Sequence, residues 1–245
     1  LGLQQRLLAR ESMQVNARLG FDFKEKNTRI QSATQSWDRS RVLSNGFDFQ
    51  SRDSWGAWTV TEDIFWGFSP HGDGFPLNSR QGENRFFKFL FSTERLQKLP
   101  WNTEGSLRFK MQLTRDQLTP QEQFFLGGAA SVIGYPESDY GADQGLLTNI
   151  EHRTPFFFLP EDWTLPWDSK PLRQQCRFLV SFDHGYGRLH GQLDSELRTR
   201  NLLGLGVGFE VKFRENLVSR LEWGVPLGDE PITETAEEQF YLSIQ

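Results

Sequence analysis

Residues 203–213 read LGLGVGFEVKF, and this stretch decides the fold class. Every second residue is apolar, and the residues between them are glycine or charged. The apolar set is Leu203, Leu205, Val207, Phe209, Val211 and Phe213. In a β-strand alternate side chains point to opposite faces, whereas a helix would scatter this set around its circumference. The stretch therefore predicts a β-strand with one apolar and one polar face.

The same alternation recurs along the chain and is clear in residues 13–24 and 107–113. Further candidate strands cover residues 42–51, 57–68, 85–92, 123–127, 146–156, 176–186, 217–227 and 240–245. The total is about eleven strands, and several match the roughly 9–11 residues of a tilted membrane-spanning strand. Residues 1–10 fit either a short helix or the end of a strand.

Composition excludes several classes of protein. The 245 residues carry a net charge of −5, and a general nucleic-acid binder would instead need a basic face. The single cysteine, Cys176, excludes an intramolecular disulfide framework and a cysteine-based zinc cluster. No stretch approaches the roughly 20 apolar residues of a transmembrane helix. The 22 phenylalanines and 22 glycines favour a β-rich chain.

Two kinds of barrel fit this alternation. In a soluble barrel that binds a small apolar ligand, the apolar face fills the core; in a membrane barrel it faces lipid, and the polar face lines a wet lumen. Strand length and tryptophans near strand ends, as at Trp58 and Trp66, favour the membrane. We therefore predict an all-β, antiparallel transmembrane β-barrel in the bacterial outer membrane. Leu203, Leu205, Val207, Phe209 and Phe213 should face outward, and Asp183, Glu210 and Lys212 should face the lumen.

Residues 124–145, FFLGGAASVIGYPESDYGADQG, interrupt the alternation. They combine glycines and three acids with an apolar and aromatic step at residues 132–135. Long loops in compact domains are usually functional or disordered. Because this step is too apolar for a simple solvated loop, we expect it to dock in the barrel lumen.

The motifs in and after this loop resemble those of the two-partner secretion transporters of the haemolysin secretion/activation type. That family belongs to the superfamily of outer-membrane protein-assembly and translocation barrels. In the loop, the matching residues are Gly127, Gly128, Val132, Ile133, Gly134, Tyr135, Asp143 and Gly145. In the strands that follow, they are Glu151, Arg153, Pro155, Phe182, Asp183 and Gly185.

The resemblance implies that residues 1–245 are the C-terminal portion of a barrel of about sixteen strands. A loop around residues 127–145 would fold inward as a plug. The implied function is export of an unfolded partner protein to the cell surface, without catalysis, metal or other cofactor. Outer-membrane lipid and other envelope proteins are the further implied partners, and nucleic acid is not one.

Two structural expectations follow. An odd number of strands cannot close as a purely antiparallel barrel, so the strands at residues 13–24 and 240–245 should not pair with each other. Strand parity places the loop at the cell-surface end and puts the connections at residues 69–83 and 160–173 at the periplasmic end.

Position 133 departs from the family pattern. Ile133 stands where the family has an arginine that pairs with the acid of the later strand, here Asp183. We therefore expect the loop to dock through apolar contact rather than a salt bridge. Asp183 would either stay unpaired at little cost in wet surroundings or be compensated by Arg153 or Arg177. The alternative function is a structural or assembly barrel of an envelope complex that exports nothing.

The sequence offers little for catalysis or for a metal. His184 and His190 share a strand face but lie about 20 Å apart, too far to chelate one ion. No Gly-x-Ser-x-Gly motif is present in the sequence, and Ser181 and His184 point to opposite faces. Glu151 and Arg153 share a polar face, so we expect a lumenal charge pair rather than a catalytic acid.

Overall fold

The structure is a computed structural model that describes residues 1–30, 33–68, 85–160, 162–165, 168–192, 196–213, 217–232 and 238–244. Most of these residues form one eleven-stranded antiparallel sheet, and two short two-stranded ribbons accompany it. The predicted all-β, antiparallel fold with about eleven strands is confirmed. Among the described residues, no helix is long and apolar enough to cross a membrane.

The main sheet is a meander in which each strand pairs with the strands before and after it. Its strands are β1 (Gly2–Arg10), β2 (Met13–Ile30), β3 (Ala33–Asp53), β4 (Gly56–Phe68), β5 (Phe86–Leu99), β6 (Thr103–Thr114), β9 (Gln144–Pro155), β12 (Cys176–Arg188), β13 (Thr199–Phe213), β14 (Leu217–Pro226) and β15 (Gln239–Ile244). The ribbons are β7 (Phe124–Leu126) with β8 (Tyr140–Ala142), and β10 (Thr164–Leu165) with β11 (Asp168–Pro171), which is followed by α1 (Leu172–Gln175).

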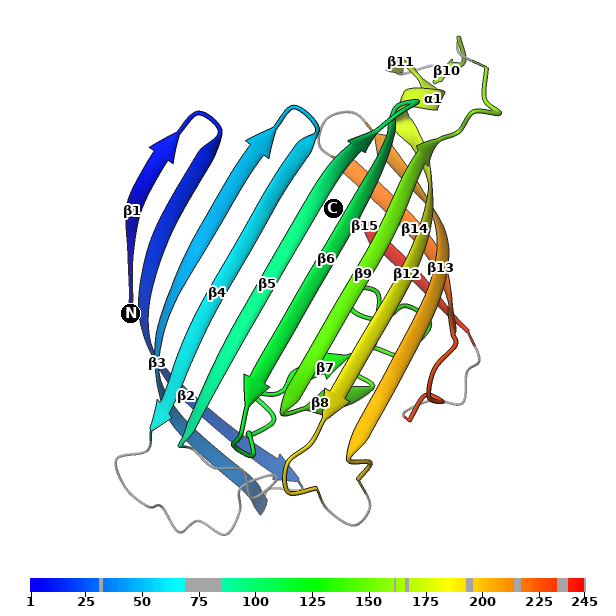
Figure 1. The fold of residues 1–245 in the computed structure, drawn as a ribbon. Helices are drawn as coiled ribbons and strands as arrows, with labels where there is room; N and C mark the ends of the chain where they lie inside the picture. The colour runs from blue at the N-terminus through cyan, green and yellow to red at the C-terminus, as the bar shows by residue number, and fades with distance from the viewer. Residues whose placement is uncertain are drawn as a thin grey trace.

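The sheet curves into a trough, and β7 and β8 lie on its concave side (Figure 1). Strands β1 and β15 are the two edges of the sheet and do not pair with each other. The expectation that the strands at residues 13–24 and 240–245 would not pair is therefore confirmed.

The predicted strand at residues 123–127 is present as β7, but its expected place in the main sheet was wrong. Residues 123–127 do not join the main sheet, because β7 pairs with β8 inside the loop; the eleventh strand is instead β1, in the segment left open between helix and strand. This error shifted the predicted parity. The connection from β4 to β5 leaves from the same end of the sheet as the connection from β6 to β9, which contains the long loop. The placement of residues 69–83 at the opposite end from that loop was therefore wrong; these residues themselves lie outside the described part.

The two ends of the sheet differ in their connections. At one end, the β1–β2, β3–β4 and β5–β6 connections are tight turns. The longer segment between β9 and β12 lies at the same end. At the other end lies the connection between β6 and β9. In outer-membrane barrels short turns are periplasmic and long loops extracellular. We call these ends the turn end and the loop end.

The convex face is apolar and the concave face is polar, as the alternation predicted. On β13, Leu205 and Phe209 are 44% and 46% exposed, whereas Glu210 is 5% exposed. Asp183 on β12 is likewise buried on the concave side. The side chain of Phe213 lies outside the described part. These apolar side chains fill no enclosed core, so the soluble-barrel alternative is wrong.

The buried apolar residues lie instead between the sheet and the β6–β9 loop. One cluster comprises Phe124, Leu126, Val132, Tyr135, Tyr140, Ala142, Leu147, Leu189 and Leu202. A smaller cluster joins Val42, Phe86 and Leu118. The apolar core of this molecule is therefore the contact between the loop and the inner wall of the trough.

Candidate functional site

Residues 115–143, which we call the lumenal loop, connect β6 to β9 and fold back onto the concave face of the sheet (Figure 1). The loop starts twelve residues earlier than the predicted residues 127–145, because the stretch before Gly127 also leaves the main sheet. Three sets of contacts hold it: at its base, along its first half and at its tip, residues 131–135.

Asp143 fastens the base of the lumenal loop. Its carboxylate accepts hydrogen bonds from the backbone N–H of Leu118 at 3.0 Å and of His190 at 2.6 Å. The first contact closes the loop on itself, and the second ties it to the turn after β12. Asp143 is fully buried. The motif residue predicted from the sequence is therefore a structural clamp.

A buried carboxylate anchors the first half of the loop to the opposite wall. Glu122 is 1% exposed and forms ion pairs with Lys88 on β5 at 2.8 Å and with Lys24 on β2 at 2.5 Å. Lys88 also donates to the backbone oxygen of Glu122 at 3.0 Å. This cluster was not predictable from the sequence, since its members are far apart in the chain and each resembles an ordinary polar residue.

Asp183 binds the tip of the loop through the main chain. Its carboxylate accepts the Ile133 N–H at 3.0 Å and the side-chain amide of Asn149 at 2.8 Å. Asn149 also donates to the backbone oxygen of Ser131, so β9 and β12 together hold the tip. The acid of the strand motif and the loop motif meet as the resemblance implied, although no arginine side chain joins them.

The expected compensation of Asp183 by an arginine was wrong. Arg153 pairs with Glu151, and Arg177 pairs with Glu104 at 3.2 Å. Both arginines lie nearer the turn end than Asp183 does, and acids are closer to them. Docking of the tip through apolar contact was expected correctly, but hydrogen bonds to the backbone accompany that contact.

Glycines on β13 and β14 form the floor under the tip. A Cβ atom on Gly204 would lie 2.1 Å from the backbone oxygen of Ile133, and one on Gly224 would lie 2.4 Å from its Cγ1. Gly206 lies under the same side chain. Gly134 has φ +89°, and a Cβ there would lie 2.5 Å from the nitrogen of Pro226. The tip approaches the sheet so closely that side chains are excluded on both sides.

Two tyrosines complete the docking of the tip. Tyr135 is fully buried, and its hydroxyl accepts the Gly228 N–H at 3.1 Å. Burial raises the pKa of Tyr135, so the phenol stays neutral. Tyr241 on β15 donates its hydroxyl to the Tyr135 carbonyl at 2.6 Å and accepts the Gly134 N–H at 3.2 Å. Tyr241 was not predicted, because nothing local in the last strand distinguishes it.

The other predicted residues divide between the two faces. Val132 packs over Gly185, where a Cβ would lie 2.7 Å from the valine Cγ2. Gly145 lies under the Phe124 ring. Phe182 is 42% exposed and lies on the convex face, so its grouping with the lumenal motif was wrong: it neighbours Asp183 in sequence and therefore points the other way.

A network of charges crosses the concave face between the tip and the turn end. Glu151 on β9 pairs with Arg153 and with Arg220 of β14, and Arg220 also pairs with Glu222. Arg220 reaches Glu151 across β12 and β13, where the residues opposite Glu151 in register are the small Ser181 and Gly206. The predicted lumenal charge pair of Glu151 and Arg153 is thus confirmed as part of a larger network.

A cavity of about 270 Å³ separates this network from the loop tip. Its lining includes Arg108, Ile133, Asn149, Asp183, Arg220 and Glu222. The inner wall beside the loop tip is therefore mainly polar and charged. Such polar lining groups can hydrogen-bond water.

Comparison with known proteins agrees with this geometry. The family model described as haemolysin secretion/activation protein ShlB/FhaC/HecB matches residues 1–211. The solved structure of CdiB from Escherichia coli superposes with a TM-score of 0.76 at 17% identity, covering 99% of this chain and 44% of that one. For CdiB from Acinetobacter baumannii the TM-score is 0.73 at 14% identity, covering 99% and 40%.

These structural matches establish the fold, and the chain spans less than half the length of both CdiB chains. A search of curated proteins gives no match. The family model covers most of the chain, including the lumenal loop and both strand motifs. The chain therefore belongs to the haemolysin secretion/activation protein family ShlB/FhaC/HecB, whose members are outer-membrane β-barrel proteins of Gram-negative bacteria.

Proposed function

We propose that the protein exports an unfolded partner polypeptide through its barrel to the cell surface. The observation that carries this proposal is the lumenal loop, which occupies the concave side of a sheet whose inner wall beside the loop tip is mainly polar and charged. Family membership supports it, since the loop and strand motifs lie within the matched residues. Hydrogen bonds to the main chain and packing on glycines hold the tip, and such contacts can be released and formed again.

The proposed export needs neither catalysis nor a cofactor from this chain. The charged residues of the inner wall pair with one another across strands, as Glu151 does with Arg220. Such pairs fit a structural role in a wet lumen. The convex apolar face, with Leu205 and Phe209, is proposed to contact outer-membrane lipid.

A secretion assay tests the proposal. The gene is deleted from its host, and a candidate partner polypeptide is followed by labelling of intact cells. Export predicts that surface labelling is lost and returns when the gene is restored, while the partner accumulates in the periplasm of the deletion strain. Equal surface labelling with and without the gene would contradict export. A loss of other outer-membrane proteins in that strain would then support the assembly alternative.

A further inference from the structure

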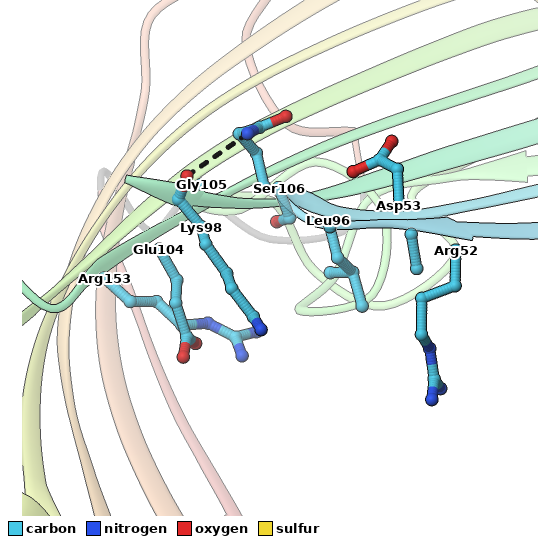
Figure 2. Close-up of a pocket in the computed structure, with 11 residues that line it drawn as sticks. Arg52, Asp53, Leu96, Lys98, Glu104, Gly105, Ser106 and Arg153 are labelled. Carbon is cyan, nitrogen blue, oxygen red and sulfur yellow. Dashed lines mark hydrogen bonds between the residues drawn. The ribbon is translucent and has the colours of Figure 1, made fainter. Parts of the chain in front are cut away.

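A second hollow, of about 370 Å³, opens on the inner wall at the turn end. Its lining includes Arg52 of β3, Leu96 and Lys98 of β5, and Glu104, Ser106 and Arg153 of β6 and β9. Figure 2 shows Arg52, Leu96 and Lys98 pointing to one side of the sheet and Asp53 to the other. The strand register shows that this side is the lumenal one, because Arg52 and Leu96 lie in the same cross-strand row of paired residues as the lumenal Glu151.

Some cations of this region form ion pairs with acids, and others do not. Glu104 and Arg153 belong to pairs with Arg177 and Glu151. Arg52 and Lys98, by contrast, form no ion pair with any residue that the structure describes. An excess of positive charge therefore remains at the mouth of the trough, although the whole chain carries a net charge of −5.

The excess continues inward along β6. Arg108 and Lys110 follow on the same face, and neither forms an ion pair within the described ranges; Glu94 of β5 is the acid opposite Arg108. Arg52, Lys98, Arg108 and Lys110 are called the entry strip from here on. Two acids lie opposite these four cations: Glu94 opposite Arg108, and Glu104, which pairs with Arg177, opposite Lys98.

The entry strip joins the mouth of the trough to the loop tip. Ser106 lines both the outer hollow and the cavity beside Ile133, so the two spaces are neighbours. Arg108 lines the inner cavity together with Ile133 and Asp183. A chain that entered at the turn end and moved toward the lumenal loop would pass these cations in order.

We propose that the entry strip binds extended, acidic segments of polypeptide at the periplasmic mouth, and this inference rests on the proposed export function. Charge of one sign inside a confined channel with low-dielectric walls concentrates ligands of the opposite sign. An extended chain presents carboxylates that unpaired Arg and Lys side chains can bind. Anionic lipid is an unsuitable ligand, because the strip lies on the concave face and lipid contacts the convex one.

Peptide binding to the full-length protein in nanodiscs tests the entry strip. The probe is a fluorescein-labelled peptide of alternating Glu and Ser, and its counterpart carries Gln in place of Glu. Fluorescence anisotropy is expected to show binding of the acidic peptide that weakens with salt, and weaker binding of its counterpart by about tenfold. The double variant R52Q/K98Q should lose about five- to tenfold in affinity for the acidic peptide.

The matched control is Arg10→Gln, which removes an exposed turn-end cation from β1 outside the hollow. It should leave binding unchanged. Wild-type affinity in R52Q/K98Q, or equal binding of the Gln peptide, would contradict the proposal. Stronger binding of inorganic polyphosphate than of the acidic peptide would indicate a phosphate site and also contradict it. Binding by the wild type without export in the secretion assay would contradict the proposed function alone.

Discussion

The interaction between Asp183 and the loop tip depends on the main chain at position 133 and not on its side chain. The Ile133 N–H donates to the carboxylate, and Asn149 supplies a second donor. Hydrogen bonds to a charged group contribute about 1.5–3 kcal/mol, and a buried donor without a partner costs about 1–3 kcal/mol. Position 133 can therefore be an isoleucine while Asp183 still binds the loop tip through the backbone N–H.

Replacing Asp183 should undock the tip. In Asp183→Ala the Ile133 N–H loses its acceptor, which costs about 1–3 kcal/mol. Hydrogen exchange at the Ile133 amide should therefore speed up by about tenfold or more. Asp183→Asn is the control, because its side-chain oxygen still accepts the N–H, and it should retain most of the protection. Unchanged protection in Asp183→Ala would show that other contacts hold the tip.

Restoring the family arginine should create a new pairing. Ile133 and Asp183 line the same cavity, so an arginine at position 133 starts close to the carboxylate. A double-mutant cycle of Ile133→Arg with Asp183→Asn should give a coupling of about 1 kcal/mol or more, read from the stability of the docked loop. No coupling would mean that the arginine points elsewhere.

At the scale of the element, the lumenal loop depends on the strands that receive it. The glycines of β13 and β14 leave room for the tip, and the buried pair of Glu122 with Lys88 holds the first half against the opposite wall. The loop thereby bridges two walls of the trough. Packing on both sides, rather than a strong local preference, fixes its conformation.

A single methyl group on β13 should displace the tip. A Cβ on Gly204 would lie 2.1 Å from the backbone oxygen of Ile133, which cannot move without the loop. Gly204→Ala should therefore make the lumenal loop several-fold more sensitive to protease. Gly105→Ala on β6 is the control, since its Cβ would lie 3.3 Å from the flexible Leu99 side chain and at an ordinary 3.9 Å from the backbone oxygen of Glu151. Equal sensitivity in both variants would contradict the tight floor.

At the scale of the whole molecule, the sheet separates an apolar convex face from a polar concave one. Arg95, which lies over Trp58 and pairs with Asp53, is a charged residue of the convex face near the turn end. Glu62 is a charged residue of the same face within the apolar band. It lies midway between Trp58 and Trp66 on β4, and its cross-strand neighbours are Phe47 and Phe91. Within the described part of the chain it forms no ion pair. Because tryptophans mark the membrane interfaces, Glu62 lies near the middle of the apolar band.

Removing this charge should stabilise the protein in lipid. A charged side chain on the lipid face is unfavourable near the bilayer centre, less so for an acid than for Lys or Arg. Glu62→Leu should raise the free energy of unfolding by about 1 kcal/mol in bilayers, measured by urea titration. Glu94→Leu on the next strand is the control, because Glu94 faces the lumen, and it should give no gain. A loss of stability in Glu62→Leu would show that the carboxylate has a partner.

The convex face of β13 and the meeting of Asp183 with the loop were predictable from the sequence. Period-two alternation predicts directly which face of the sheet each side chain occupies. The loop and strand motifs resemble those of a known family, in which the two meet. The strand at residues 123–127 was predicted correctly as a strand, but it pairs with β8 inside the loop and not with the main sheet. Alternation gives the faces of a strand and does not identify its partner.

The sequence by itself determined the all-β class, the polar and apolar faces and the position of the long loop, since these follow from the covalent order of residues and the geometry of a strand. Apart from Asp183, only the tertiary structure decided which residues the loop contacts. The Lys24–Glu122 pair, the glycine floor and the contacts of Tyr241 join residues far apart in the chain. Such contacts depend on how the sheet curves and how the loop lies across it, and no local pattern encodes either.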